Sequence, residues 1–93
     1  MYIVFVNYQD RDAVERMRPS HLEWIRRQTA EGTMLFTGRR TSPESGIMVG
    51  QAPDLAAFRA LLAADPYVQA GAAAHEVIEF DPRGGSLLPM LRA

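Results

Sequence analysis

Apolar residues occur in short blocks along this chain, and the spacing within each block predicts its secondary structure. Residues 2–6 are uniformly apolar and rich in β-branched and aromatic side chains, a pattern typical of a strand that is covered on both faces. Residues 33–39, 46–50 and 74–80 form similar short blocks, separated by glycine, proline and polar residues. The pattern therefore predicts four strands.

Two other segments have apolar residues at helical spacing. The first predicted helix covers residues 20–31, where Ser20 and Glu23 fit the capping box that begins many helices. The second begins after Asp54, which suits an N-cap, and it ends shortly before Pro66, because proline cannot continue a regular helix. We therefore expect two helices between the predicted strands.

The remaining segments are predicted to connect these elements. Residues 9–18 are densely charged and favour a solvated connection, whereas residues 40–45 favour a turn and residues 66–71 a turn or a short helical piece. We expect one ferredoxin-like domain over residues 1–82 and a C-terminal tail over residues 83–93. The tail is apolar for an exposed end, which points to docking on this subunit or on a partner.

The predicted order of elements is β-α-β-β-α-β, which is typical of the ferredoxin-like α+β fold. In that fold a four-stranded antiparallel sheet carries two helices on one face. The other face would expose apolar residues of the first two strands, and an exposed apolar face predicts a partner. We therefore expect a homodimer in which two open sheet faces pack together, giving a dimeric α+β barrel.

Composition and charge narrow the classes of function. The 93 residues are 47% hydrophobic and 23% charged, which is typical of a globular domain. The absence of cysteine excludes disulfides and cysteine-based metal sites, and the net charge of −1 argues against nucleic acid or anionic membranes as partners. The sequence contains no lysine, which excludes Schiff-base chemistry on that residue. The N-terminal apolar run ends at Asn7, too short for a signal peptide or a membrane span, so we expect a cytoplasmic protein.

One imidazole and one carboxylate stand at predicted helix ends. His21 lies in the first turn of the first predicted helix, where the helix dipole disfavours the imidazolium and keeps the ring a neutral base. Asp65 lies just beyond the second helix, and a carboxylate beside a histidine orients one ring nitrogen. The alternative is that Asp65 only forms a turn before Pro66 and that His21 is a solvated residue. Spacing alone leaves both interpretations open.

Three further residues each have more than one interpretation. Tyr67 is either a pocket phenol or a core aromatic, and Arg39 either binds a substrate carboxylate or phosphate or is solvated. His75 is a second proton-handling group, a metal ligand together with His21 and Asp65, or an edge-strand residue without function. The chain contains no Gly-rich phosphate loop, nucleophilic-serine elbow or dinucleotide fingerprint, so we expect no organic cofactor.

Two segments resemble the YCII-related family. They are Arg18-Pro19-Ser20-His21-Leu22 and Ala64-Asp65-Pro66-Tyr67-Val68-Gln69-Ala70-Gly71, followed by His75, and the resemblance extends over residues 2–80. It implies a ferredoxin-like fold, a dimeric α+β barrel and an active site built from His21 and Asp65. One branch of the family looks like a dehydrochlorinase of chlorinated hydroxyquinols, and the wider superfamily includes muconolactone isomerases and small monooxygenases. The chain departs from the family at Gly38-Arg39, where Gly-Pro is common, and in its tail from Pro82.

These observations favour a small-molecule enzyme in which His21 is a general acid or base and Asp65 sets its tautomer. The expected chemistry is isomerisation, elimination or lactone handling on a cyclic or aromatic metabolite. The candidate substrate contacts are Tyr67, Arg39, Arg18 and His75. A non-catalytic dimeric module that binds a small ligand or a partner protein is the alternative, and a metal-dependent enzyme using His21 and His75 is a third hypothesis.

Overall fold

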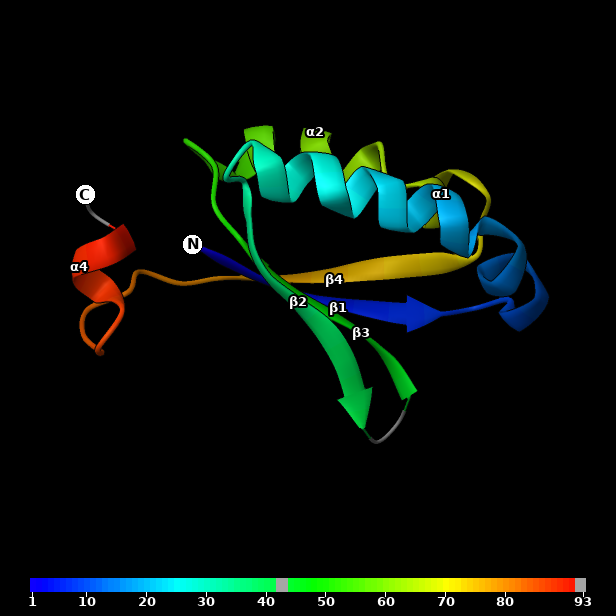
Figure 1. Cartoon of the computed structure of the whole chain (residues 1–93), viewed down its shortest axis with the longest axis horizontal. Coiled ribbons are helices and arrows are strands. Elements are labelled where there is room, and N and C mark those ends of the chain that lie inside the picture. Colours follow the sequence, from blue (N-terminus) through cyan, green and yellow to red (C-terminus); the bar gives the residue numbers. More distant parts are fainter. Residues whose placement is uncertain (42–43, 92–93) are drawn as a thin grey trace.

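One antiparallel sheet with helices on a single face forms the body of the protein (Figure 1). The structure is a computed structural model that describes residues 1–41 and 44–91. Its strands are β1 (Tyr2–Tyr8), β2 (Met34–Thr41), β3 (Glu44–Gly50) and β4 (Ala73–Glu79). Its helices are α1 (Arg11–Ala30), α2 (Leu55–Ala63), α3 (Pro66–Gln69) and α4 (Leu88–Leu91). The strand order β2-β3-β1-β4 confirms the predicted ferredoxin-like arrangement.

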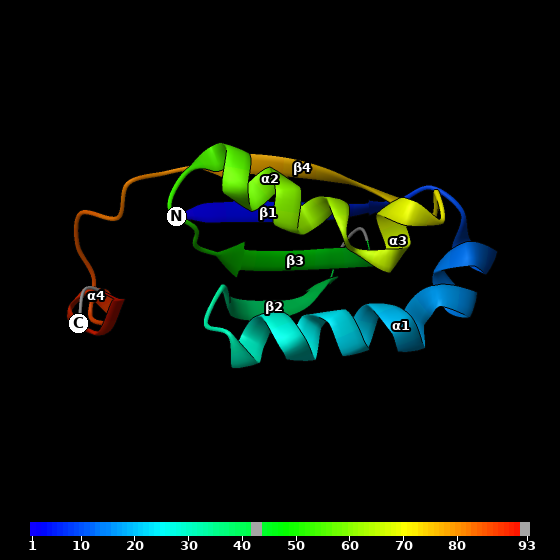
Figure 2. The same cartoon turned by 90° about the horizontal axis from the view of Figure 1, so that it is seen from above.

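The core lies between the sheet and the helices. Figure 2 shows this arrangement from the side of the helices. Strand β1 is central and pairs antiparallel with β3 on one side and β4 on the other, so that Val4 lies opposite Met48 and Val77. Directly paired residues share a face of the sheet. The buried residues of this face are Tyr2, Val4, Val6, Met34 and Met48, and they pack against Trp24 of α1 and Phe58 of α2.

Helix α1 is longer than the sequence pattern indicated. It begins at Arg11, and the side chain of its N-cap, Asp10, accepts a hydrogen bond of 3.1 Å from the Ala13 backbone. The predicted start at Ser20 and the solvated connection over residues 9–18 are therefore wrong. Ala13 and Val14 interrupt this charged run, and because both are buried they hold the first turns of the helix against the core.

Pro19 lies inside α1 rather than before it. Because proline has no backbone N–H and its ring crowds the carbonyl four residues earlier, it weakens the helix there without ending it. Figure 1 shows that the first turns of α1 run in a different direction from the rest of the helix. His21 is consequently in the middle of α1, and the predicted effect of the N-terminal helix dipole on its ring does not apply.

The other element boundaries follow the sequence more closely. Asp54 caps α2, accepting a hydrogen bond of 2.8 Å from the Ala57 backbone. Residues 66–69 form a short helix, which is one of the two alternatives predicted for this segment. Strand β2 continues to Thr41 and strand β3 begins at Glu44, so most of the turn predicted over residues 40–45 is strand. The other two residues of that turn lie outside the described ones.

The second face of the sheet carries apolar side chains without helices over it. Ile3 lies opposite Val49 and Ile78, and Val49 in turn lies opposite Phe36, so these four residues form a row across all four strands. Phe36 is 55% exposed and Ile78 is 42% exposed. We name this row the open face.

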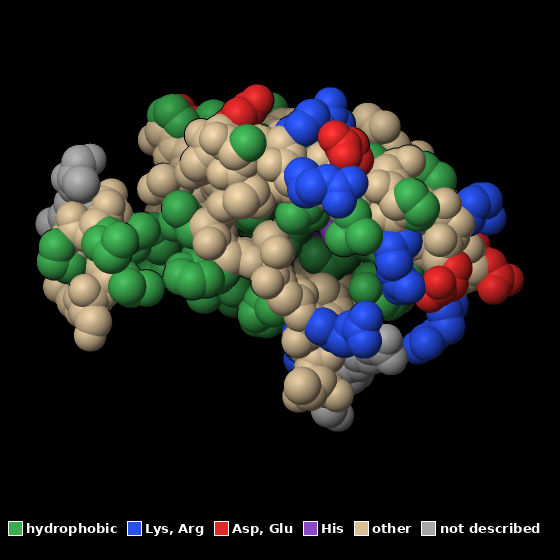
Figure 3. All heavy atoms as spheres, in the orientation of Figure 1, with side chains coloured by type: hydrophobic (Ala, Val, Ile, Leu, Met, Phe, Trp, Pro, Cys, Tyr) green, Lys and Arg blue, Asp and Glu red, His purple; other side chains and the backbone are tan. Residues whose placement is uncertain are grey.

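The C-terminal tail leaves the end of β4 and carries α4 away from the rest of the protein (Figure 1). Leu87 and Met90 of this segment are exposed, and Figure 3 shows hydrophobic side chains gathered on the tail and beside it. The last two residues of the predicted tail lie outside the described ones. In the part of the chain that the structure describes, no helix has the length and apolarity needed to cross a membrane.

Candidate functional site

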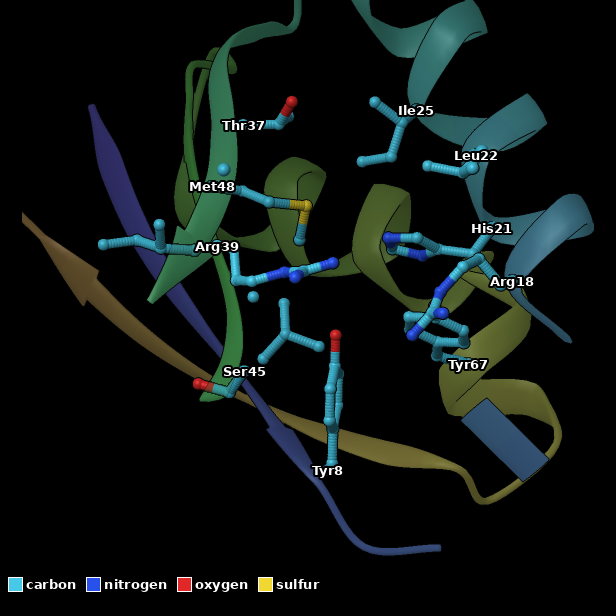
Figure 4. A pocket seen from close by; sticks show the side chains of 14 residues that line it. Tyr8, Arg18, His21, Leu22, Ile25, Thr37, Arg39, Ser45, Met48 and Tyr67 are labelled. Carbon is cyan, nitrogen blue, oxygen red and sulfur yellow. The ribbon is translucent and has the colours of Figure 1, made fainter. Parts of the chain in front are cut away.

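A pocket of about 290 Å³ lies between α1 and the covered face of the sheet (Figure 4). Residues of β1, β2, β3, α1 and α3 surround it, with Leu22, Ile25 and Met48 among its apolar walls. Its polar residues are Tyr8, Arg18, His21, Thr37, Arg39, Ser45 and Tyr67, although the Ser45 hydroxyl points away from the pocket in Figure 4. Arg18, His21, Leu22 and Ile25 share one face of α1 because they are three or four residues apart.

His21 and Asp65 meet at the edge of this pocket although 44 residues separate them in the sequence. The Nδ1 atom of His21 lies 2.7 Å from Oδ1 of Asp65. Asp65 is extended because Pro66 follows it, and this conformation lets its side chain cap α3 by accepting a hydrogen bond of 3.0 Å from the Tyr67 backbone. The Asp-Pro-Tyr segment thus turns the carboxylate toward the middle of α1.

His75 of β4 approaches the same carboxylate from the other side. Its Nε2 atom lies 2.8 Å from Oδ2 of Asp65, so the two imidazoles are on different oxygens. The side chain of Asp65 is fully buried, and those of His21 and His75 are 13% and 8% exposed. The three side chains form a buried His21–Asp65–His75 cluster.

The cluster keeps Asp65 ionised. Burial alone would raise the pKa of this carboxyl, but the hydrogen bonds with His21 and His75, the charge of His21 and the backbone N–H of Tyr67 outweigh burial and lower the pKa to about 2. An ionised carboxylate only accepts hydrogen bonds. Each imidazole therefore donates an N–H to it, and Nε2 of a neutral His21 ring is left without a proton.

Tyr67 covers the imidazole of His21. The two rings are stacked with centroids 3.9 Å apart and an angle of 6° between their planes, and Tyr8 meets Tyr67 edge-on at 6.1 Å. Burial raises the pKa of Tyr67, so the phenol is neutral. The interaction with the Tyr67 phenol raises the pKa of Arg18, whose guanidinium lies near the stacked rings in Figure 4.

Two guanidinium groups lie at the pocket. Arg18 and Arg39 both border it, and none of the described residues around it is Asp or Glu. Arg18 also contacts Glu15, one turn earlier in α1, at 2.9 Å. Both side chains are partly exposed, so solvent screens this ion pair. Figure 3 shows arginine side chains around the hollow between α1 and the sheet. This arrangement favours an anionic ligand.

Of the residues singled out in the sequence, His21, Tyr67, Arg18 and Arg39 border the pocket, and Asp65 lies behind His21. His75 does not border it. This residue instead lines a second cavity of about 300 Å³, together with Arg59, Leu62, Val68 and Val77.

Sequence reasoning missed Tyr8, Thr37 and Ser45 as pocket residues. The alternation of β1 contained a signal for the first of them, because Tyr2, Val4 and Val6 are buried and Tyr8 continues the same face. The Ser45 hydroxyl is buried and, among the described residues, has no hydrogen-bond partner.

The cluster is not arranged as a metal site. Within residues 1–41 and 44–91, no three side chains of His, Cys, Asp or Glu are placed to hold a metal ion together. The physical reason is the position of Asp65, since its oxygens face two separate ring nitrogens at hydrogen-bonding distance. What the geometry provides is an oriented imidazole beside a pocket lined by two arginines, and this imidazole can accept or donate a proton.

Comparison with known proteins adds two findings. The family model of the YCII-related domain matches residues 1–81. Among solved structures, the chain is similar to 5-chloro-2-hydroxyhydroquinone dehydrochlorinase (TftG) from Burkholderia phenoliruptrix AC1100, in complex with 2,5-dihydroxybenzoquinone, with a TM-score of 0.70 and 13% identity. The match covers 87% of this chain and 94% of the other. No curated protein matches the chain.

Proposed function

The chain belongs to the YCII-related family, and from this membership we propose that it is a small-molecule enzyme in which His21 and Asp65 perform general acid–base chemistry. The observation that carries the proposal is the 2.7 Å contact between Nδ1 of His21 and Oδ1 of Asp65 at the edge of a pocket. A carboxylate in this position fixes the tautomer of the ring and stabilises the imidazolium that forms when the ring takes a proton.

In the proposed reaction, Nε2 of His21 removes a proton from the substrate. The electron pair left behind forms a new double bond while a leaving group departs with its own electrons, or the proton returns at another atom, which gives isomerisation. Negative charge that develops on the substrate is stabilised by the guanidinium groups of Arg18 and Arg39. These residues, with the stacked Tyr67, are the proposed substrate contacts.

The size and charge of the pocket support a small anionic ring as substrate. A cavity of about 150 Å³ is enough to take up benzene. The pocket of about 290 Å³ therefore accommodates one substituted ring, and its arginines suit a phenolate, enolate or carboxylate. We propose a lyase or isomerase reaction, and elimination of the dehydrochlorinase type is one member of that class, since TftG is named for such a reaction.

Chloride release from 5-chloro-2-hydroxyhydroquinone is the direct test of the elimination. We expect the protein to release chloride from this compound, and we expect this release to disappear in His21→Gln. Arg26→Gln is the matched control, because Arg26 lies on the same helix and its side chain is 69% exposed. If His21→Gln released chloride as fast as the unchanged protein, His21 would not be the base.

A non-catalytic ligand-binding module is the second candidate function. It is favoured by the apolar tail, in which Leu87 and Met90 are exposed, because such a segment suits an accessory protein working in a complex. Binding of 2,5-dihydroxybenzoquinone by a protein that releases no chloride from 5-chloro-2-hydroxyhydroquinone, with the affinity unchanged in Asp65→Asn, would support this function over the enzymatic one. The binding is measured by titration calorimetry.

We further propose that the protein forms a homodimer through the open face. Phe36, Val49, Ile3 and Ile78 give that face a continuous apolar row, and helices cover only the opposite face. Packing two such faces together would remove the row from water.

A further inference from the structure

His75 is a buried titratable side chain to which the proposed reaction assigns no role. Its side chain is 8% exposed, and it lies on β4 directly opposite Val6, on the covered face of the sheet. A histidine is seldom this buried without a partner, and its partner here is the carboxylate that holds His21.

The three hydrogen bonds to Asp65 are unequally divided between its oxygens. Oδ1 accepts from both Nδ1 of His21 and the Tyr67 backbone, whereas the described contact of Oδ2 is with Nε2 of His75. The final torsion of an aspartate side chain is broad and roughly two-fold, so the side chain itself does not select one orientation of the carboxylate. A donor on Oδ2 is what pins the second oxygen and thereby aims Oδ1 at His21.

We propose that His75 is a positioning residue, which fixes the tautomer of His21 through the shared carboxylate of Asp65. The inference deepens the proposed function and rests on it for its catalytic meaning, although the effect on the tautomer does not depend on turnover. Without the donor on Oδ2, the buried oxygen would lose its partner, and the carboxylate would turn to find another.

The location of His75 argues against direct contact with a substrate in the pocket. Asp65 stands between it and His21, and His75 borders the second cavity with Arg59, Val68 and Val77. Its influence on the pocket therefore passes through the carboxylate. The chemical requirement at position 75 is one N–H donor at the place of Nε2, and this requirement separates a positioning role from simple packing.

The test compares variants that keep or remove this donor. His75→Gln places an amide N–H close to the position of Nε2. His75→Phe keeps a ring without the donor, and His75→Asn carries a donor that is too short to reach. Val77→Ala is the matched control, because it trims the wall of the same cavity and leaves the Asp65 contacts intact.

Nitrogen NMR of the imidazole rings reports the tautomer of His21 near neutral pH. We expect His21 to remain in the Nδ1–H form in the unchanged protein, in His75→Gln and in Val77→Ala. In His75→Phe and His75→Asn, we expect the Nε2–H form to appear. If His75→Phe does not fold, the comparison of His75→Asn with His75→Gln decides the question. A purely Nδ1–H His21 in a folded variant without the donor overturns the inference.

Turnover separates this inference from the proposed function. If the unchanged protein releases chloride from 5-chloro-2-hydroxyhydroquinone, we expect kcat to fall about tenfold in His75→Asn with KM unchanged, and to recover in His75→Gln. Equal loss of kcat in both of these variants overturns the positioning role. If no variant releases chloride but the tautomer responds as described, the proposed elimination fails and the positioning role stands.

Discussion

His21 of α1 and Tyr67 of α3 are stacked almost parallel, with ring centroids 3.9 Å apart and 6° between the ring planes. Tyr67 also donates its backbone N–H to Oδ1 of Asp65, the oxygen that faces His21. One residue therefore contacts both members of the proposed acid–base pair. Its ring sets the plane of the imidazole, while its backbone sets the position of the carboxylate.

Replacing the aromatic ring tests the stacking separately from the phenol. Tyr67→Phe keeps the stack and removes the phenol that interacts with Arg18, so we expect a higher KM with kcat nearly unchanged. Tyr67→Leu loses the stack, which is worth roughly 1 kcal/mol, or about a fivefold lower kcat. Steady-state kinetics of chloride release measure both effects. Equal kcat values for the two variants would contradict a role for the stacking.

The stability of the protein in acid should depend on Asp65. The pKa of its carboxyl is lowered from 3.8 to about 2, because the hydrogen bonds with the two histidines outweigh the effect of burial. Since the folded value is below the unfolded one, this group stabilises the fold fully above pH 3.8, and the contribution is lost as pH falls toward about 2. The contribution amounts to roughly 2 kcal/mol.

Urea unfolding over this pH range measures that contribution. We expect the free energy of unfolding of the unchanged protein to fall more steeply with acid than that of Asp65→Asn, which has no carboxyl to protonate. The other acidic residues titrate in both proteins and therefore cancel in the comparison. Parallel pH profiles for the two proteins would show that the carboxylate is not held as described.

Gly50 is predicted to be intolerant of a side chain. A Cβ atom at this position would lie 2.7 Å from Cε1 of Phe58 and 2.8 Å from the backbone oxygen of Thr33, so either the core ring or the chain must move. We expect Gly50→Ala to destabilise the protein by about 1–3 kcal/mol. Gly38→Ala is the control within β2, because its Cβ would meet only Ile47 at 3.9 Å. Thermal unfolding that ranks both variants equally would contradict this packing.

The open face provides a prediction on assembly. Phe36→Glu places a charge in the apolar row, and we expect the proposed dimer to dissociate about thirtyfold more readily, the effect of a hot spot of about 2 kcal/mol. Met90→Ser tests the tail separately, since Met90 is 74% exposed on α4. Sedimentation velocity over a range of concentrations measures both. A Phe36→Glu protein that dimerises as well as the unchanged chain would place the interface elsewhere.

The sequence pattern predicted the fold well because periodicity and turn residues are local. It failed at the start of α1, where Pro19 suggested a boundary and the density of charge concealed Ala13 and Val14. Burial of these two residues is a tertiary effect, and it outweighs the local signal. The same error placed His21 at a helix end, when it lies in mid-helix.

The cluster was only partly predictable for a different reason. Asp65 and His21 were identified as a pair, but 44 residues separate them, and spacing could not decide between contact and solvation. The partner of His75 depended on the register of β4, which sets His75 opposite Val6 on the covered face. Register follows from the packing of the whole sheet, so it was not visible in the residues around position 75.

The measurement that tests the central claim most directly is the nitrogen NMR spectrum of the two imidazoles in the unchanged protein near neutral pH. The contacts with Asp65 predict that a neutral His21 carries its proton on Nδ1 and has a free Nε2, and that His75 is protonated on Nε2. A His21 ring protonated only on Nε2 would contradict the account, because its Nδ1 could not then donate to the carboxylate.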